Sequence, residues 1–411
     1  MNSFDPPPPP PSSASSLDGA RVMRPRRAAP ADAVRPTRAE VNLASLRHNL
    51  RVVQKHADGQ KVWAVLKADG YGHGAPAVAR TLERAGANGF CVALLEEGIE
   101  LREAGILAPI LVMGGYYGSA TAELLARKLT PVVYDLSQIE AFARLVKSGA
   151  AQSPVDVHLK VDTGMARLGV RMNELEAFAR KIADTKEVRV VGLMTHLAEA
   201  DALSPDDMRH QMSMFEDATT RLTKFGISAS VRHAANSAAV LRREAKLDAV
   251  RPGVAIFGVA PVPLVQNGNE SGDLRLTMRV RTEIAALRTI EAGEKVGYGG
   301  LWKAARNSII ATIPMGYADG LSRALSNKGH ALVRGKRALI VGAISMDMAM
   351  LDVTDLPGVS VRDEAVVLGS QEGVLGKDTI SADEVATHAG TIAWEVLTSI
   401  SRRVPRFYRE P

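Results

Sequence analysis

The chain holds a single cysteine, Cys91, among its 411 residues, so no disulfide can form within it. One cysteine is typical of proteins from a reducing compartment, and Cys91 lies in the apolar run 89–95, where we expect inert core. No apolar run approaches the roughly 18 residues of a membrane span, and the N-terminus lacks the apolar segment of a secretory signal. We therefore expect a cytoplasmic protein with no membrane partner.

A large excess of charge of one sign is also missing. The formal net charge is +6. Residues 1–50 contain seven Arg, no Lys and four Asp or Glu, which accounts for +3 and leaves +3 for the rest of the chain. This excess is too small to indicate a nucleic-acid partner.

The length suffices for two domains, preceded by a segment that has little to bury. Residues 1–34 contain a run of six prolines and are otherwise rich in Ser, Ala and Arg, which predicts a disordered tail. Alternatively, the proline run could be recognised by a proline-binding partner instead of being merely solvated. Residues 38–43 are strand-like and 46–55 helical, and we expect 35–45 to join the C-terminal domain.

From residue 61 apolar β-type runs alternate with amphipathic helical stretches, which predicts an α/β fold with a parallel sheet. Eight such units over residues 35–274 match a closed (β/α)8 TIM-type barrel. The predicted strands are 62–66, 89–95, 109–113, 130–134, 155–161, 188–195, 229–234 and 249–254. The clearest predicted helices are 96–104, 136–147, 172–183 and 205–225.

The pattern changes in residues 275–411, where long helical stretches vanish until a predicted helix at 381–388. Short alternating runs take their place, punctuated by Gly, Pro, Asp and Asn, which indicates a mostly β C-terminal domain. The runs are 277–287, 309–313, 331–333, 338–350 and 364–368.

Lys67 follows the first predicted strand directly and precedes a turn with three glycines. The C-terminal ends of barrel strands are where such folds place their chemistry. An amine that emerges there from apolar surroundings has a lowered pKa and can form a Schiff base with an aldehyde cofactor. A charged residue that merely caps a strand is the alternative.

Polar residues also stand at or just after the ends of other predicted strands. They are Lys160, Asp162, Arg167, His196, His233, Asn236, Ser237 and Arg251. A packed barrel interior is filled by branched aliphatic residues, so these side chains predict a functional rim. Ser237 opens a helix beside the Gly253–Val254 backbone, which would bind phosphate. A plain N-cap at Asn236 and a core histidine at His196 are the alternatives.

Several motifs occur in an order that resembles the alanine racemases, which are pyridoxal 5'-phosphate enzymes with a barrel followed by a β domain. The motifs are Val-Leu-Lys-Ala-Asp-Gly-Tyr-Gly-His-Gly at 65–74, the segment 159–169, His-Ala-Ala-Asn-Ser-Ala-Ala at 233–239, Arg-Pro-Gly at 251–253, Gly-Tyr-Ala-Asp-Gly at 316–320, Met346-Asp347 and Arg-Val-Pro-Arg at 403–406. The resemblance extends from about residue 36 to the end of the chain.

This resemblance implies a role for each matching residue. Lys67 would hold the cofactor as an internal aldimine and act as one base, and Tyr317, in the C-terminal domain, would be the second base, reaching over from the other subunit of a head-to-tail homodimer. The implied cofactor contacts are Lys67, Tyr71, Arg167, His196, Asn236, Ser237, Arg251, Gly253, Val254 and Trp394. The implied amino-acid substrate contacts are Arg167, Met346 and Asp347. Lys160 matches a lysine that is often carbamylated, and no metal ion is implied.

Two bases are needed because racemisation removes a proton from one face of a carbon and delivers one to the other. The resemblance places Arg251 at the cofactor's ring nitrogen, where an arginine, unlike an aspartate, cannot accept the ring proton, so the nitrogen should stay unprotonated. The sequence departs from the family at Trp394, where tyrosine is usual, and at Ala343, where arginine is common. These departures keep open a racemase of broader range, acting on serine or lysine. A non-catalytic pyridoxal phosphate-binding protein is a third interpretation, which the C-terminal domain disfavours.

Overall fold

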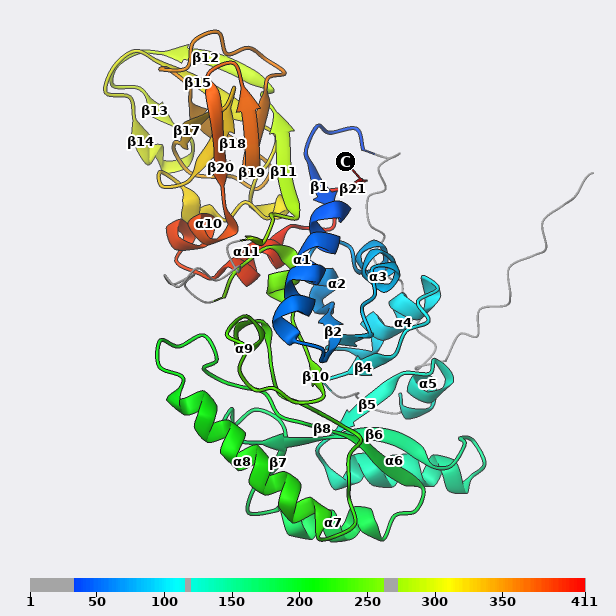
Figure 1. Ribbon diagram of the computed structural model, residues 1–411. Helices are drawn as coiled ribbons and strands as arrows, with labels where there is room; N and C mark the ends of the chain where they lie inside the picture. The colour runs from blue at the N-terminus through cyan, green and yellow to red at the C-terminus, as the bar shows by residue number, and fades with distance from the viewer. Residues whose placement is uncertain (1–32, 115–119, 262–272, 411) are drawn as a thin grey trace, which may run out of the picture.

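The computed structural model describes residues 33–114, 120–261 and 273–410. The tail predicted over residues 1–34 therefore lies almost entirely outside the described part of the chain. Figure 1 shows two bodies, one built from the N-terminal half and one from the C-terminal third, with the first strand of the chain beside the second body.

The N-terminal body is a closed barrel of eight parallel strands, as predicted. Strand order is β5-β4-β3-β2-β10-β9-β8-β6, and β5 pairs with β6 to close the ring. The strands are β2 (Lys61–Val65), β3 (Gly89–Val92), β4 (Ile110–Val112), β5 (Thr130–Val133), β6 (Val155–Asp162), β8 (Val188–Met194), β9 (Val231–His233) and β10 (Ala249–Val250). Short β7 (Val170–Arg171) adds to β6.

The last barrel strand is shorter than the predicted run 249–254. It ends at Val250, because Pro252 has no N–H for the ladder and the chain then turns into the 3-10 helix η2 (Val254–Phe257). Arg251 and Gly253 are thus placed just beyond the strand end.

Helices cover the barrel on its outer face (Figure 1). They are α1 (Leu43–Ala57), α3 (Ala75–Arg84), α4 (Leu95–Glu103), α5 (Thr121–Ala126), α6 (Leu136–Lys147), α7 (Leu175–Ala183), α8 (Asp206–Thr223) and α9 (Ser237–Leu241). In α1, Leu46, Leu50 and Val53 recur at helical spacing and are fully buried. Burying each such side chain contributes roughly 1.5–3 kcal/mol. The Asn42 side chain caps this helix by accepting from the Ser45 amide.

The C-terminal body is built on a ten-stranded sheet with the order β12-β15-β18-β17-β16-β19-β11-β1-β21, and β20 pairs with β19. Its strands are β1 (Arg38–Asn42), β11 (Met278–Glu283), β12 (Ala286–Ile290), β15 (Ser308–Ile313), β16 (His330–Val333), β17 (Lys336–Ile340), β18 (Ala349–Asp352), β19 (Glu364–Gly373), β20 (Gly376–Ile380) and β21 (Arg406–Arg409). A two-stranded ribbon of β13 (Lys295–Val296) and β14 (Trp302–Lys303) is separate. Helices α10 (Ala382–Ala389) and α11 (Ala393–Ser399) follow β20.

Two predicted strands of this body were wrong in extent. The run 277–287 is split into β11 and β12 because the chain changes partners: Ile284 N donates to Asp363 O near β19, and Ala285 N donates to Thr312 O on β15. The run 338–350 is split into β17 and β18. Gly342, with a φ of 72°, turns the chain between them.

The limits of the two domains stay an interpretation, although β1 pairs antiparallel with β11 and parallel with β21. One apolar cluster runs through both bodies and includes Leu66 from the barrel and Leu397 from α11. The bodies therefore share a core.

The two bodies meet at the turn that follows β2. The short helix α2 (Lys67–Tyr71) packs against α11. Gly72 has a φ of 76°, and a Cβ built there would lie 2.3 Å from the Leu397 carbonyl oxygen. The Arg406 Nε donates to the Gly72 carbonyl oxygen at 2.9 Å. The C-terminal body thus holds the backbone of the turn that begins with Lys67.

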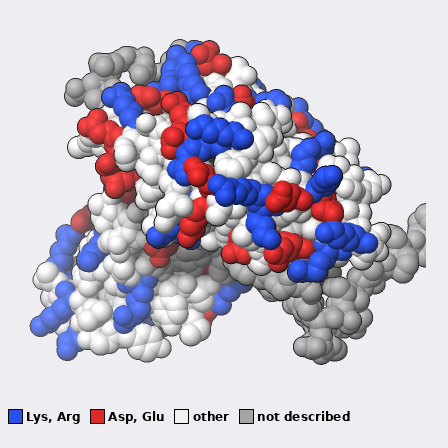
Figure 2. Space-filling model, turned by 90° about the horizontal axis from the view of Figure 1, so that it is seen from below, with Lys and Arg blue, Asp and Glu red and all other residues white. Residues whose placement is uncertain are grey.

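The surface carries charges of both signs. On the face shown in Figure 2, Lys and Arg side chains are interspersed with Asp and Glu. Exposed ion pairs occur, such as Arg189 with Asp156 at 2.7 Å. Of the helices that the structure describes, none combines the length and the apolar character needed to cross a membrane.

We predict that Gly72→Ala lowers the free energy of unfolding by more than the matched variant Gly105→Ala. Both glycines have positive φ, which costs alanine about 1–2 kcal/mol, but a Cβ at Gly105 meets nothing within 4 Å. Gly72→Ala adds the clash with Leu397, which brings its cost to about 2–5 kcal/mol. Urea denaturation of the two variants measures the difference in the free energy of unfolding. Equal decreases for both variants would show that the contact between Gly72 and Leu397 tolerates a side chain.

Candidate active site

Lys67 lies at the C-terminal end of β2, in a backbone of unusual conformation. Ala68, Asp69 and Tyr71 all have positive φ, between 51° and 59°, which costs a non-glycine residue roughly 1–3 kcal/mol each. Burial, and then the Arg167 guanidinium, lower the pKa of the Lys67 amine below its ordinary value. A larger fraction of this amine is therefore unprotonated and nucleophilic at neutral pH than for a free lysine.

Glu97, at the start of α4, holds this turn and was not singled out from the sequence. Its Oε1 accepts from the Ala68 amide at 2.6 Å, and its Oε2 accepts from the amides of Ala93 and Leu94 at 2.8 and 3.1 Å. No local sequence signal marks this role, because Ala68 and Glu97 meet only when β2 and β3 pair side by side.

A second group of residues, for which an anion site was predicted, lies together in the structure. The Ser237 Oγ accepts from the amides of Gly253 and Ala255 at 2.8 and 3.3 Å, and a Cβ at Gly253 would lie 2.3 Å from the Tyr71 hydroxyl oxygen. Asn236 also caps α9, by accepting from the Ala239 amide at 3.1 Å. The residues from β2, β9 and β10 therefore meet in one corner, and Val254 follows with its side chain buried.

Arg251 lies buried beside this corner and makes several hydrogen bonds through its terminal nitrogens. It donates to the carbonyl oxygens of Thr195 and Ala234 at 2.8 and 3.1 Å, and its Nη1 is 2.6 Å from the His233 Nδ1. Its Nη2 is 3.3 Å from the His196 Nδ1. Its Nε is buried and has no partner among the described residues. This N–H group is available to an acceptor that is not part of the protein.

The charge on Arg251 affects the bases around it. Burial and then Arg251 lower the pKa values of His196 and His233, and the same two causes lower that of His158 to about 4. His158 and His233 are joined at 2.8 Å between Nδ1 and Nε2. These histidines are therefore neutral at pH 7.

Lys160 and Arg167 approach the same rim from β6 and the loop after it. Lys160 is buried, and burial, followed by Arg167 and Arg251, lowers its pKa to about 8. No carboxylate of the described residues forms an ion pair with Lys160. Asp162 shapes the loop that carries Arg167, since its Oδ1 accepts from the amides of Gly164 and Ala166 at 3.1 Å each.

Tyr317, Met346 and Asp347 gather at the edge of the C-terminal body. The Tyr317 amide donates to Ser345 O and the Ala318 amide to Met346 O, each at 3.0 Å. The side chains of Tyr317 and Met346 are 43% and 53% exposed. Within one chain the Tyr317 hydroxyl makes no hydrogen bond to another described residue, and none joins it to Lys67. The structure thus presents Tyr317 outward.

Asp319 fixes this edge and was part of a recognised motif, but no role was predicted for it. It is fully buried and accepts from Arg35 and Arg403 at 2.7 Å each and from the Gly316 amide at 3.1 Å. Arg403 also donates to Asp347 at 2.5 Å. This network ties the Tyr317 turn to Asp347, and its members lie too far apart in the chain for a local pattern to reveal it.

Trp394 lies on α11, the helix that packs against the Lys67 turn. Its ring is half-buried against the shared apolar cluster. Its position beside α2 agrees with a place at the site, but no described hydrogen bond shows what its indole N–H binds.

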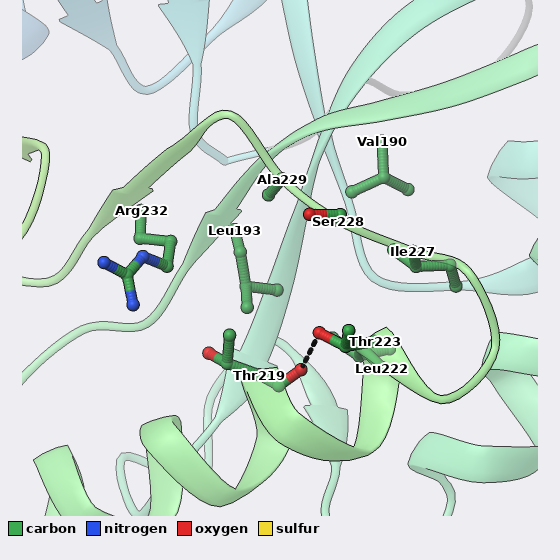
Figure 3. Close-up of a pocket in the computed structure, with 9 residues that line it drawn as sticks. All are labelled: Val190, Leu193, Thr219, Leu222, Thr223, Ile227, Ser228, Ala229 and Arg232. Carbon is green, nitrogen blue, oxygen red and sulfur yellow. Dashed lines mark hydrogen bonds between the residues drawn. The ribbon is translucent and has the colours of Figure 1, made fainter.

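A hollow of about 200 Å³ between α8 and the barrel is separate from this rim (Figure 3). It is lined by Leu193, Thr219, Leu222 and others, and Arg232 is the charged residue drawn in it. Arg232 pairs with Asp248 at 3.3 Å, and none of the predicted site residues lines this hollow.

Two family models match almost the whole described chain. The model for the alanine racemase N-terminal domain matches residues 41–261, and that for the alanine racemase C-terminal domain matches residues 277–408. The chain belongs to the alanine racemase family. The predicted fold, a TIM-type barrel with a mostly β domain after it, is confirmed.

Relatives of known name agree with this assignment. The alanine racemase of Sorangium cellulosum is 60% identical over 385 residues, which cover 92% of this chain and 100% of that protein. The alanine racemase of a Geobacter species is 40% identical over a match that covers 91% of this chain and 99% of that protein. This identity supports alanine racemase function for the chain.

Solved structures of the family superpose closely. Alanine racemase from a D-cycloserine-producing Streptomyces lavendulae has a TM-score of 0.84 at 32% identity, covering 92% of this chain and 98% of that one. The Bartonella henselae alanine racemase, solved with covalently bound pyridoxal phosphate, has a TM-score of 0.80 at 29% identity, covering 91% and 99%.

We predict that Gly253→Ala weakens pyridoxal phosphate binding, because its Cβ would displace the Tyr71 hydroxyl. Tyr71→Phe removes the clashing oxygen, so the double variant should bind more tightly than the sum of the two single losses allows. Titration of the cofactor-free proteins gives the four affinities, and strictly additive losses would contradict the contact.

Proposed function

We propose that this chain interconverts L- and D-alanine with pyridoxal 5'-phosphate, using Lys67 and Tyr317 as bases on opposite faces of the substrate. The observation that carries the proposal is the unpartnered, buried Nε of Arg251 at the rim where the pKa of Lys67 is lowered. The covalently bound pyridoxal phosphate of the Bartonella henselae relative supports the choice of cofactor.

The residues of the rim fit this cofactor. Its phosphate suits the corner formed by Tyr71, Asn236, Ser237, Gly253 and Val254, where a side chain on Gly253 would fill the available space. Its ring nitrogen is an acceptor that suits the Arg251 Nε, and His196 lies beside Arg251.

When bound, the cofactor withdraws electrons from the α-carbon of the substrate, which makes the proton there acidic. The Lys67 Nζ accepts or returns this proton on one face, and the Tyr317 Oη does so on the other. Arg167 attracts the substrate carboxylate, and Met346 and Asp347 border the approach. Trp394 narrows the site beside the Lys67 turn.

Arg251 limits the chemistry to racemisation. Burial lowers its pKa only to about 10, so it keeps its charge at neutral pH and lacks the readily lost proton of a carboxylic acid. Arg251 would hold the ring nitrogen by donating to it, and would thereby leave the cofactor a moderate electron sink. Side reactions that need a stronger sink are disfavoured.

The exposed Tyr317 supports a head-to-tail homodimer, in which the edge of one C-terminal body covers the barrel rim of a second copy. Each of the two sites would combine Lys67 of one protomer with the tyrosine of the other. This arrangement explains why Tyr317 has no hydroxyl partner in its own described chain. The product D-alanine would feed peptidoglycan synthesis.

Lys160 is a candidate for carbamylation. Its pKa of about 8 leaves part of the amine unprotonated at neutral pH, and only this form reacts with CO2. A carbamate carries a negative charge, which would attract Arg167 where the unmodified ammonium repels it.

We predict that mixed dimers of Lys67→Ala and Tyr317→Phe chains are active although either variant alone is not. Half of randomly assembled dimers are mixed, and each mixed dimer has one site with both bases, so about a quarter of wild-type activity should return. Alanine racemisation by co-expressed, differently tagged chains measures this, and serine and lysine in the same assay test substrate range.

The control is each variant paired with its own kind. Lys67→Ala alone should also lose the visible absorbance of the tethered cofactor. A mixed dimer no more active than its parents would show that both bases come from one chain.

A further inference from the structure

A cluster of three potential metal ligands lies in the C-terminal body. His330 is the first residue of β16, and Glu384 and His388 lie on α10. One ligand atom from each lies within 4.8 Å of those of the other two. Among all residues that the structure describes, this is the one group of three or more His, Cys, Asp or Glu side chains close enough to share an ion.

The helix α10 and its packing beside β16 bring these side chains together. Glu384 and His388 are four residues apart and therefore lie on one face of α10. Ser381 fixes the start of this helix by accepting from the Glu384 amide at 3.1 Å. The rings of His330 and His388 are 5.9 Å apart between centroids.

His330 carries a second, independent observation. Its Nδ1 is buried and has no hydrogen-bond partner among the described residues. Buried nitrogens of this kind are ordinarily paired, so an unpaired one on a residue of this cluster points to a missing partner.

We propose that His330, Glu384 and His388 bind a transition metal ion of the Zn²⁺ type, with water as the fourth ligand. Two imidazoles and one carboxylate form a donor set that suits a tetrahedral zinc ion. Metal–ligand bonds of about 2.0–2.2 Å would draw the three atoms closer than they now lie. The ion would thereby tie α10 to β16. This site does not depend on the racemase site.

Arg337 on β17 sets the affinity of this site. Its guanidinium donates to both carboxylate oxygens of Glu384, with Oε2 at 3.1 Å, and to the Asp378 Oδ2 at 2.8 Å. A metal ion must compete with this cation for the carboxylate. Replacing Arg337 with an uncharged residue should therefore strengthen metal binding, whereas a purely structural cluster would bind no metal in either case.

Metal binding would act on the element next to Tyr317. Helix α10 packs against α11 and against the 3-10 helix η6 (Arg323–Leu325). Val385 and Ala389 of α10 line a hollow of about 290 Å³ that Tyr317 also lines. An ion at His388 would stiffen this wall, so we expect it to raise the thermal stability of the chain.

The test titrates Co²⁺ into the untagged, chelator-treated holoenzyme, since tetrahedral Co²⁺ shows intense visible absorption, and then displaces it with Zn²⁺. We predict one ion per chain, binding at least about tenfold weaker in His388→Gln and Glu384→Gln, and tighter binding in Arg337→Gln. His210→Ala, an exposed histidine on α8, is the matched control and should bind as the wild type does.

Circular dichroism and racemase activity check that each variant is folded. Absence of saturable binding in both the wild type and Arg337→Gln would overturn the proposal. Binding that His388→Gln and Glu384→Gln leave unchanged would also overturn it, because the ion would then be held elsewhere, for example by the cofactor phosphate.

Discussion

The buried guanidinium of Arg251 is the charge on which the barrel rim depends. Burying a cation is costly unless hydrogen bonds compensate, and here two backbone carbonyls and the His233 ring do so. Burial, and then this charge, lower the pKa values of His196 and His233, and burial, Arg167 and Arg251 together lower the pKa of Lys160. The rim therefore combines neutral histidines with the permanent cations Arg251 and Arg167, which suits an anionic cofactor.

Strain and domain contact act together at the Lys67 turn. Left-handed conformations at Ala68, Asp69 and Tyr71 persist because Glu97 holds the Ala68 amide and Arg406 holds the Gly72 carbonyl. The C-terminal body thus has two uses. It stabilises the turn that carries Lys67 in its own chain, and it presents Tyr317 outward on a network centred on Asp319.

Much of the fold and the rim could be predicted from the sequence, because both depend on local periodicity. Apolar runs located the eight barrel strands, and polar residues at their ends drew attention to Lys67, Ser237 and Arg251, whose roles stay predictions. Strand splitting at Ile284 could not be predicted, since it follows from a change of pairing partner between distant strands. Glu97 and Asp319 were missed for the same reason.

The metal-ligand cluster marks the limit of such reasoning. Glu384 and His388 show a helical spacing that the sequence displays, but His330 joins them only through the sheet. Two potential ligands on one helix do not make a metal site without the third ligand, His330, which the folded sheet brings beside them. Long-range contacts of this kind need the folded structure.

The most direct measurement for this account is the protonation state of the cofactor's ring nitrogen. Nitrogen NMR of the enzyme loaded with pyridoxal phosphate labelled with ¹⁵N in the ring reports it. Because the Arg251 Nε should donate to this nitrogen and lacks a readily lost proton, we predict the chemical shift of an unprotonated pyridine at neutral pH. The shift of a protonated pyridinium would contradict the role assigned to Arg251.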